Sequence, residues 1–190
     1  MKYLFIILIS LILLFACNDS TKPTNNPQPQ FGTDGEIIND FLEYLTDDYL
    51  LNQMNYDEMP IYFHDDLKYL EENVFSTDDT LISSALGYSS LTGNEFDDQR
   101  EAYIEIINNP DKKKELLDYL KNNFQAEELQ DDETVPYASF VMPYFSGDNK
   151  SAVVGYGDYC GNLCAHWYLS LFIFENGKWQ HKETLSFSIS

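Results

Sequence analysis

Residues 151–188, SAVVGYGDYCGNLCAHWYLSLFIFENGKWQHKETLSFS, are rich in β-branched and aromatic residues interrupted by short glycine- and asparagine-containing links. Apolar segments separated by Gly-Asn-Leu and Glu-Asn-Gly are typical of strands joined by tight turns. A further segment of the same kind precedes them and is linked through Ser-Gly-Asp-Asn. Because short turns make consecutive strands antiparallel neighbours, we expect a four-stranded antiparallel β-meander with strands at about 135–145, 151–160, 164–174 and 178–188.

The Glu-Asn-Gly link between the last two strands admits two registers. A two-residue turn at Asn176 and Gly177 would pair Phe174 with Trp179, and it would set an apolar row of one strand opposite polar residues of the next. A three-residue loop with Gly177 in the left-handed conformation pairs Ile173 with Trp179 and aligns the apolar rows better. We therefore predict the three-residue loop.

Helical patterns dominate the chain before residue 131. A capping-box spacing at Thr33-Asp34-Gly35-Glu36 is followed by apolar residues at helical intervals. The segment 76–86 fits a helix and a strand equally well. The sequence predicts an α+β domain over 34–190, with a helical region at 34–130 and the antiparallel β region at 131–190. Within the helical region we expect helices at 34–51, 65–73, 96–108 and from Pro110 through Phe124.

The amino terminus predicts export. Lys2 precedes an apolar run that is short for a membrane span of roughly 20 residues but typical of a signal peptide, which we place at 1–16. The run ends in Leu14-Phe15-Ala16-Cys17, which resembles a bacterial lipobox. The resemblance implies cleavage before Cys17 and lipidation of that residue. The alternative is an uncleaved anchor, or an ordinary signal whose cysteine is accidental.

Residues 17–33 would then comprise the lipidated cysteine and a tether. The segment is polar and contains prolines, so it lacks the apolar surface needed to fold. Two or more acyl chains anchor a protein stably where one does not. We expect a lipoprotein held at the cell membrane or outer membrane by its lipid anchor, with the domain outside the cytoplasm.

The chain is strongly acidic, with 32 Asp and Glu against 11 Lys and Arg and a formal net charge of -21. Such a surface repels nucleic acid phosphates and attracts cationic proteins, peptides or divalent ions. None of the acidic pairs along the chain has the alternating oxygen ligands and closing glutamate of a calcium loop. We therefore expect a cationic protein or peptide as partner, no nucleic acid and no cofactor.

Cys160 and Cys164 flank the Gly-Asn-Leu link, with His166 two residues further on. Thiols outside the cytoplasm tend to be oxidised. If all three link residues form the loop, the cysteines become cross-strand partners within reach of a disulfide. If only two residues turn, Cys164 pairs with Tyr159 and the two sulfurs face opposite sides of the sheet. We predict the disulfide, whose role would be to fix the turn.

Three other interpretations of these residues stay open. The cysteines would be inert if they were buried thiols. With His166 and His181 they offer the four ligands that zinc prefers, although the spacing matches no common zinc finger. His166 would activate Cys164 as a nucleophile only if the two met, and residues two apart on a strand lie roughly 6.5–7 Å from each other.

Part of the carboxyl-terminal region is similar to a known pattern. The pattern consists of Tyr159-Cys160-Gly161-Asn162-Leu163-Cys164 before a strand that ends in Asn176-Gly177-Lys178-Trp179, with Phe145 to Lys150 and Ala152 to Val154 ahead of it. It resembles small uncharacterised bacterial lipoproteins that carry a lipobox and this hairpin. Members often have glycine after the second cysteine, where this chain has Ala165. The resemblance implies the fold and the location, but no activity.

These observations favour a non-catalytic, lipid-anchored binding or accessory module of the cell envelope. A more specific version is an immunity or inhibitor protein that masks a cationic toxin or a lysozyme-like enzyme, since electrostatic steering would speed its capture. A structural subunit of an envelope assembly is another class. It would expose an apolar patch of strand residues such as Trp167, Tyr168 or Trp179.

An envelope hydrolase using a Cys/His or carboxylate site is the alternative from the enzyme class. It requires a pocket in which chemically active side chains converge with perturbed pKa values. The candidates for that pocket are Tyr156, Asp158, His166 and His181.

Overall fold

The computed structural model describes residues 35–54, 59–65, 82, 85, 95–130, 134–161 and 164–189. The predicted signal peptide, Cys17 and the tether lie outside these residues, as does nearly all of the predicted helix at 65–73. Of the segment 76–86, only Ile82 and Ala85 are described, and both are helical and buried. Among the described helices, none is long and apolar enough to cross a membrane.

The helices confirm most of the helical pattern read from the sequence. Helix α2 (Gly35–Glu43) continues directly into the π-helix η1 (Tyr44–Gln53), and together they occupy the range expected for the first helix. Helices α5 (Glu95–Asn108) and α6 (Pro110–Phe124) are separated by Asn109. The Asn109 side chain caps α6 by accepting hydrogen bonds from two backbone N–H groups of its first turn, at 3.1 and 3.2 Å.

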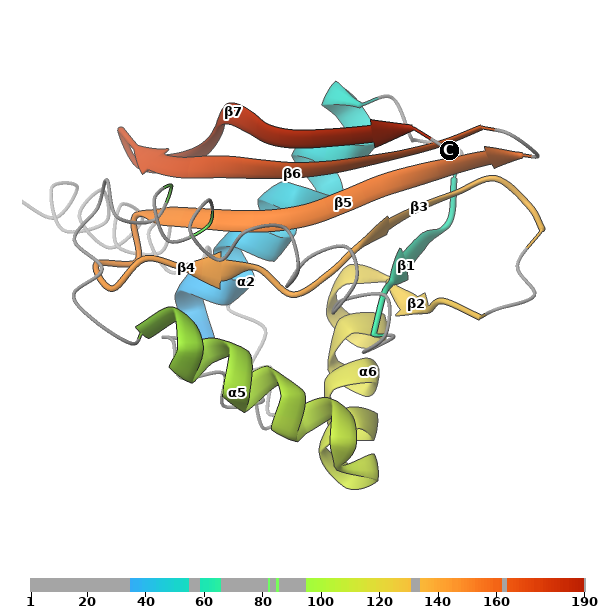
Figure 1. Ribbon diagram of the computed structural model, residues 1–190, viewed down its shortest axis with the longest axis horizontal. Helices are drawn as coiled ribbons and strands as arrows, with labels where there is room; N and C mark the ends of the chain where they lie inside the picture. The colour runs from blue at the N-terminus through green and yellow to red at the C-terminus, as the bar shows by residue number, and fades with distance from the viewer. Residues whose placement is uncertain are drawn as a thin grey trace, which may run out of the picture.

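The described strands form one seven-stranded sheet in the order β2-β1-β3-β5-β6-β7, with β4 also paired to β5 (Figure 1). Three long strands are antiparallel neighbours: β5 (Ser151–Gly161), β6 (Cys164–Glu175) and β7 (Lys178–Ile189). Four short strands extend the sheet on the β5 side: β1 (Ile61–Phe63), β2 (Glu127–Glu128), β3 (Tyr137–Phe140) and β4 (Tyr144–Phe145). The α+β class is therefore correct.

The four-stranded meander was wrong in its extent. The strand expected at 135–145 is two strands, β3 and β4, which pair with different parts of β5. Between them lies Pro143, which has no N–H to donate to a ladder. Strands β1 and β2 come from the region expected to be helical, and β1 runs parallel to both of its neighbours. Strands of two or three residues are too short to give a readable alternation.

The two faces of the sheet differ in their surroundings. Helices α2 and η1 pack on one face, called here the helix face, and lie behind β5–β7 in Figure 1. On β5 the helix face carries Ala152, Val154, Tyr156 and Asp158, whose β6 partners are Phe172, Ser170, Tyr168 and His166. The opposite face carries Val153, Gly155, Gly157 and Tyr159, whose partners are Leu171, Leu169, Trp167 and Ala165.

An aromatic cluster joins α2 to the sheet. The ring of Phe41 lies 5.6 Å from Phe145, 5.5 Å from Phe172 and 4.9 Å from Trp179, each with edge-to-face geometry. All four side chains are buried. Edge-to-face pairs of this kind contribute about 0.5–1.5 kcal/mol beyond the burial of their area. The cluster therefore holds the helix against strands β4, β6 and β7.

The cluster also explains why the predicted three-residue loop was wrong. The structure has a two-residue turn at Asn176 and Gly177, with φ of 56° and 77°, and pairs Phe174 with Trp179. This register puts Trp179 on the helix face against Phe41, whereas the three-residue loop would have turned it to the opposite face. Two register shifts along β6 and β7 then absorb the mismatch. Burial of one large ring outweighed the alignment of the smaller apolar residues.

Candidate functional site

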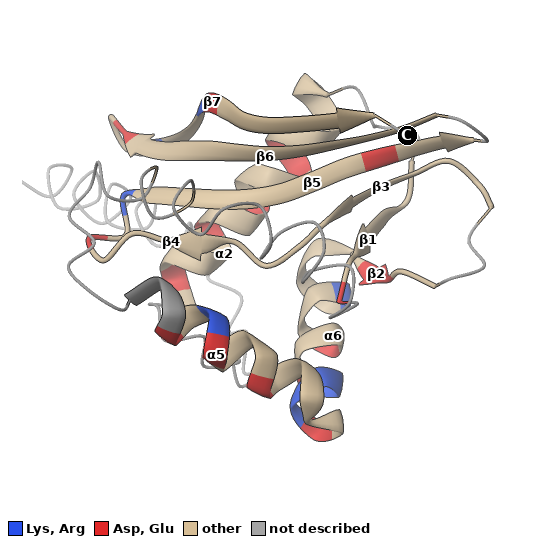
Figure 2. Cartoon of the chain, viewed as in Figure 1, with Lys and Arg blue, Asp and Glu red and all other residues tan. Residues whose placement is uncertain are grey.

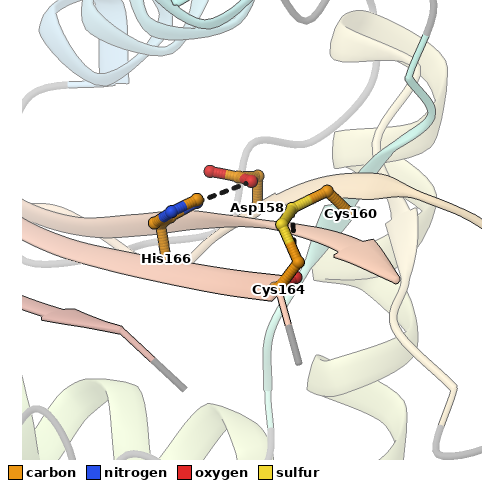
Figure 3. Close-up of a disulfide and its surroundings, with 4 residues drawn as sticks. All are labelled: Asp158, Cys160, Cys164 and His166. Atoms are coloured by element: carbon orange, nitrogen blue, oxygen red, sulfur yellow. Dashed lines mark hydrogen bonds and ion pairs between the residues drawn. A yellow bond between two sulfur atoms is a disulfide. The ribbon is translucent and has the colours of Figure 1, made fainter. Parts of the chain in front are cut away.

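The end of the β5–β6 hairpin brings Cys160 and Cys164 to disulfide-bonding distance, with their Cα atoms 5.2 Å apart (Figure 3). The expected loop geometry was only partly correct. The direct partner of Cys164 is Gly161, and Tyr159 pairs with Ala165, so Cys160 is the extra residue of a bulge. Gly161 has φ of 121°, a conformation that favours glycine and allows this bulge. The bulge turns the Cys160 sulfur toward Cys164.

A histidine–aspartate pair lies beside the two sulfurs on the helix face. Nδ1 of His166 is 3.1 Å from Oδ2 of Asp158, and the two residues are direct cross-strand partners (Figure 3). The Asp158 side chain is 7% exposed and that of His166 is 32% exposed. A ring nitrogen of His166 and both sulfurs lie within 4.8 Å of one another. The sequence named Asp158 with His166 as candidates for a hydrolase pocket and the two cysteines with His166 as candidate zinc ligands, but it did not indicate that all four meet.

His181 lies apart from this group. It pairs with Phe172, stacks on Tyr49 with ring centroids 5.4 Å apart, and has Nε2 3.3 Å from Oγ1 of Thr184. Burial lowers the pKa of His181 from its ordinary value. The four-ligand set of two cysteines and two histidines is therefore not brought together, because His181 stands opposite a residue far along β6 from His166.

Tyr156 belongs to a chain of hydroxyls that begins beneath η1 and ends at the exposed Thr184. Its hydroxyl lies 2.8 Å from that of Tyr49 and 3.1 Å from Oγ of Ser170, which donates in turn to Oγ1 of Thr184 at 3.3 Å. Burial and the bond to Tyr156 raise the pKa of Tyr49. The residues expected to converge in a hydrolase pocket thus divide into two groups, Asp158 with His166, and Tyr156 with the surroundings of His181.

An open pocket of about 210 Å³ lies on the opposite face of the sheet. Tyr137 and Tyr159 stack there with ring centroids 5.4 Å apart. The indole of Trp167 lies flat on two glycines: a Cβ atom at Gly155 would be 2.5 Å from its Cζ2 atom, and one at Gly157 would be 2.8 Å from Cε3. The pocket is lined by His64, Tyr137, Ser139, Gly157, Asp158, Tyr159, Ala165, His166, Trp167 and Ser188.

This pocket could not be predicted from the sequence, because it depends on the pairing of β3 with β5 and on two glycines whose missing side chains leave room for the Trp167 ring. Its lining contains no lysine or arginine, and the carboxylate of its one acidic residue, Asp158, lies on the helix face. The charged residues of the described chain lie mainly on the helices, while β5 and β6 carry only Asp158 and Glu175 (Figure 2). The pocket is therefore an aromatic surface without lysine or arginine on an acidic protein.

The apolar patch expected for a structural subunit is not built from the three residues named for it. Trp179 is 5% exposed under α2. Trp167 is half-buried in the pocket, and Tyr168 is half-buried on the helix face, where it stacks on Tyr156 with ring centroids 5.2 Å apart. Among the described residues, the exposed large apolar side chains are Val135, Phe187 and Ile189.

No protein-family model, curated protein or solved structure matches the chain.

Proposed function

We propose that the protein is a lipid-anchored binding module of the cell envelope whose ligand is a cationic protein or peptide. In this proposal Cys17 carries the lipid, residues 17–33 tether the domain to the cell membrane or outer membrane, and the domain works outside the cytoplasm. The observation that carries the proposal is the aromatic pocket around Trp167 on a chain with a net charge of -21.

The faces of tryptophan and tyrosine rings attract cations, by about 0.5–1 kcal/mol at exposed sites and about 2 kcal/mol when water is displaced. Trp167, Tyr137 and Tyr159 present such rings in one pocket whose lining has no lysine or arginine. The acidic surface adds long-range attraction that accelerates encounter with a basic partner and weakens as salt rises. A lysine or arginine side chain of a basic partner is the ligand group that fits both features.

A cationic toxin or a lysozyme-like enzyme is the partner for which this chemistry is most useful. A membrane-tethered acidic domain would intercept such a protein before it reached the envelope, as an immunity protein or inhibitor does. The pocket floor lies on the paired strands β5 and β6, which supports this role, because a preformed surface loses little conformational entropy on binding.

The binding test uses the processed chain with Cys17→Ser, which prevents lipidation. Isothermal titration with hen lysozyme and with an oligolysine peptide, at low and at physiological salt, measures affinity and its salt dependence. We expect Trp167→Ala to weaken binding roughly tenfold, which corresponds to about 1.4 kcal/mol. Phe187→Ala is the matched control, since Phe187 is an exposed aromatic residue outside the pocket lining.

Absence of binding to either probe at low salt, or equal losses in the two variants, would refute the cationic-ligand proposal. If the samples instead hydrolyse a chromogenic ester or peptide, and His166→Ala abolishes the turnover, the envelope hydrolase would take its place. The anchor is tested separately: radiolabelled palmitate should enter the wild-type protein, and Cys17→Ser should release the chain from the membrane fraction.

A further inference from the structure

We propose that reduction of the Cys160–Cys164 pair converts the end of the β5–β6 hairpin into a binding site for one Zn²⁺ ion. The ligands would be the two cysteine thiolates and His166. The structure already places a ring nitrogen of His166 and both sulfurs within 4.8 Å of one another. In a tetrahedral zinc site, sulfur at about 2.3 Å and nitrogen at about 2.0 Å from the metal stand roughly 3.3–3.8 Å apart. Opening the sulfur–sulfur bond would let the two sulfurs separate toward this spacing.

Asp158 gives the site the outer partner that zinc-binding histidines generally have. A ligating histidine usually donates its other ring N–H to a carboxylate, which fixes the tautomer and the ring orientation. Here Oδ2 of the buried Asp158 lies 3.1 Å from Nδ1 of His166. With Nδ1 held in this way, Nε2 is the nitrogen that would donate to the metal. This preformed carboxylate–histidine pair distinguishes the group from two cysteines near a histidine by chance.

The histidine and its carboxylate partner are held on both sides within the sheet, because Asp158 also pairs with Ala138 and His166 also pairs with Ile189. Cys164 and His166 belong to β6, Cys160 and Asp158 belong to β5, and both strands are held by neighbours along most of their length. Sites built on strands keep their geometry better than sites on loops. Cys160, Cys164 and His166 are all half-buried, so solvent and ions reach them. Three protein ligands leave the fourth position of the zinc to water.

The two states of the site exclude each other. A dithiol reductant of the envelope would give two electrons and two protons to the Cys160–Cys164 disulfide, forming two thiols and becoming a disulfide itself. The two thiols then lose their protons as their sulfurs bind Zn²⁺. An oxidant that accepts two electrons reverses the sequence and releases the ion. The hairpin would thus hold zinc only in its reduced form.

The experiment uses the processed chain with Cys17→Ser, reduced and desalted without oxygen, and titrated with Co²⁺ as a coloured substitute for Zn²⁺. We expect one Co²⁺ per chain with a sulfur-to-cobalt charge-transfer band, and displacement of Co²⁺ by Zn²⁺. The oxidised protein should show no such band. Asp158→Asn should weaken binding about 10–100-fold, and His166→Asn at least as much.

His181→Asn is the matched control, because His181 lies on the same sheet but outside the group of proposed ligands. The His181→Asn variant should bind Co²⁺ with the same affinity as the chain with Cys17→Ser alone. A reduced chain without the charge-transfer band, or equal affinities for the His166 and His181 variants, would overturn the proposal.

The midpoint potential of the cysteine pair, measured on the chain with Cys17→Ser alone, tests the proposal without relying on variants that could misfold. Zn²⁺ at 100 times its Kd should favour the reduced form about 100-fold and raise the midpoint potential of the cysteine pair by about 60 mV. An unchanged midpoint potential would equally overturn the proposal.

Discussion

Gly155 and Trp167 should be strongly coupled in stability, because the indole ring occupies the space where a side chain at Gly155 would stand. A Cβ atom there would lie 2.5 Å from Cζ2 and 3.3 Å from Cε2 of Trp167, and 3.1 Å from Cγ2 of Val141. Carbon atoms in favourable contact are about 3.5–4.0 Å apart, so the ring would have to move by about 1 Å. It also lies on Gly157, so it cannot simply slide along β5.

The expected magnitudes follow from this geometry. Gly155→Ala should destabilise the wild-type background by about 1–3 kcal/mol, the usual cost of overpacking. In the Trp167→Ala background the contacts with the ring are gone, and the remaining one, 3.1 Å to Cγ2 of Val141, requires that methyl group to shift by only a few tenths of an ångström. The same change should then be neutral, or stabilising by about 0.5 kcal/mol, because alanine restricts the unfolded chain more than glycine does. The coupling free energy, the difference between the two costs, should therefore be about 1–3.5 kcal/mol.

The assay is a double-mutant cycle by urea unfolding of the four proteins, followed by far-UV circular dichroism. Gly157→Ala provides a contrast, because a Cβ atom there would also meet the backbone carbonyl of His166, which removal of the Trp167 ring does not relieve. Gly157→Ala should therefore lower the free energy of unfolding in the Trp167→Ala background as well. If Gly155→Ala cost the same in both backgrounds, the ring would not occupy that space and the account of the pocket floor would be incorrect.

Three further perturbations test the rest of the fold. With a sequence separation of 4 between the bonded residues, removing the disulfide by reductant or by Cys160→Ser with Cys164→Ser should cost about 2 kcal/mol by the chain-entropy relation; unchanged urea midpoints would argue against the bond. The lowered pKa of His181 means that the folded chain resists a proton that the unfolded chain accepts. Stability should therefore fall as pH drops from about 7 to about 5, and by less in His181→Gln than in the wild type, which thermal melts across that range would measure. Gly177→Ala places a Cβ atom at φ of 77° and should cost about 1–2 kcal/mol, unless the two-residue turn is incorrect.

The sequence predicted the parts of the fold that rest on local chemistry. Strands β5, β6 and β7 were readable because long apolar segments alternate with links that contain glycine and asparagine, and each signal repeats within the same stretch. The start of helix α6 at Pro110 could also be predicted locally, because proline is favoured in the first turn of a helix. Where several local sequence signals agree, they determine the secondary structure largely without tertiary contacts.

Most of what the sequence could not predict depends on contacts between distant residues. The turn at Gly177 permits either loop length, and the choice came from Trp179 packing on Phe41 of α2. The bulge at Cys160 is a local feature, in which Gly161 pairs with Cys164, and neither of the two loop geometries considered for the sequence contained it. The pocket requires β3 to lie beside β5, so that Tyr137 stacks on Tyr159. A short segment of sequence does not contain the contacts that decide the turn at Gly177 or form the pocket.

The alternation of the β5–β6 pair places the two proposed sites back to back. Gly157 and Trp167 face the pocket, while the next cross-strand pair, Asp158 and His166, faces the cysteines on the helix face. The backbone between them is shared, because the carbonyl of His166 is the group that a Cβ atom at Gly157 would meet. Movement of His166 on binding zinc would therefore alter the floor of the pocket. Titrating the cationic ligand into the reduced protein with and without Zn²⁺ measures this coupling, and thermodynamic reciprocity requires the ligand to change the zinc affinity by the same factor. Equal ligand affinities in the two states would mean that the sheet separates the sites energetically as well as spatially.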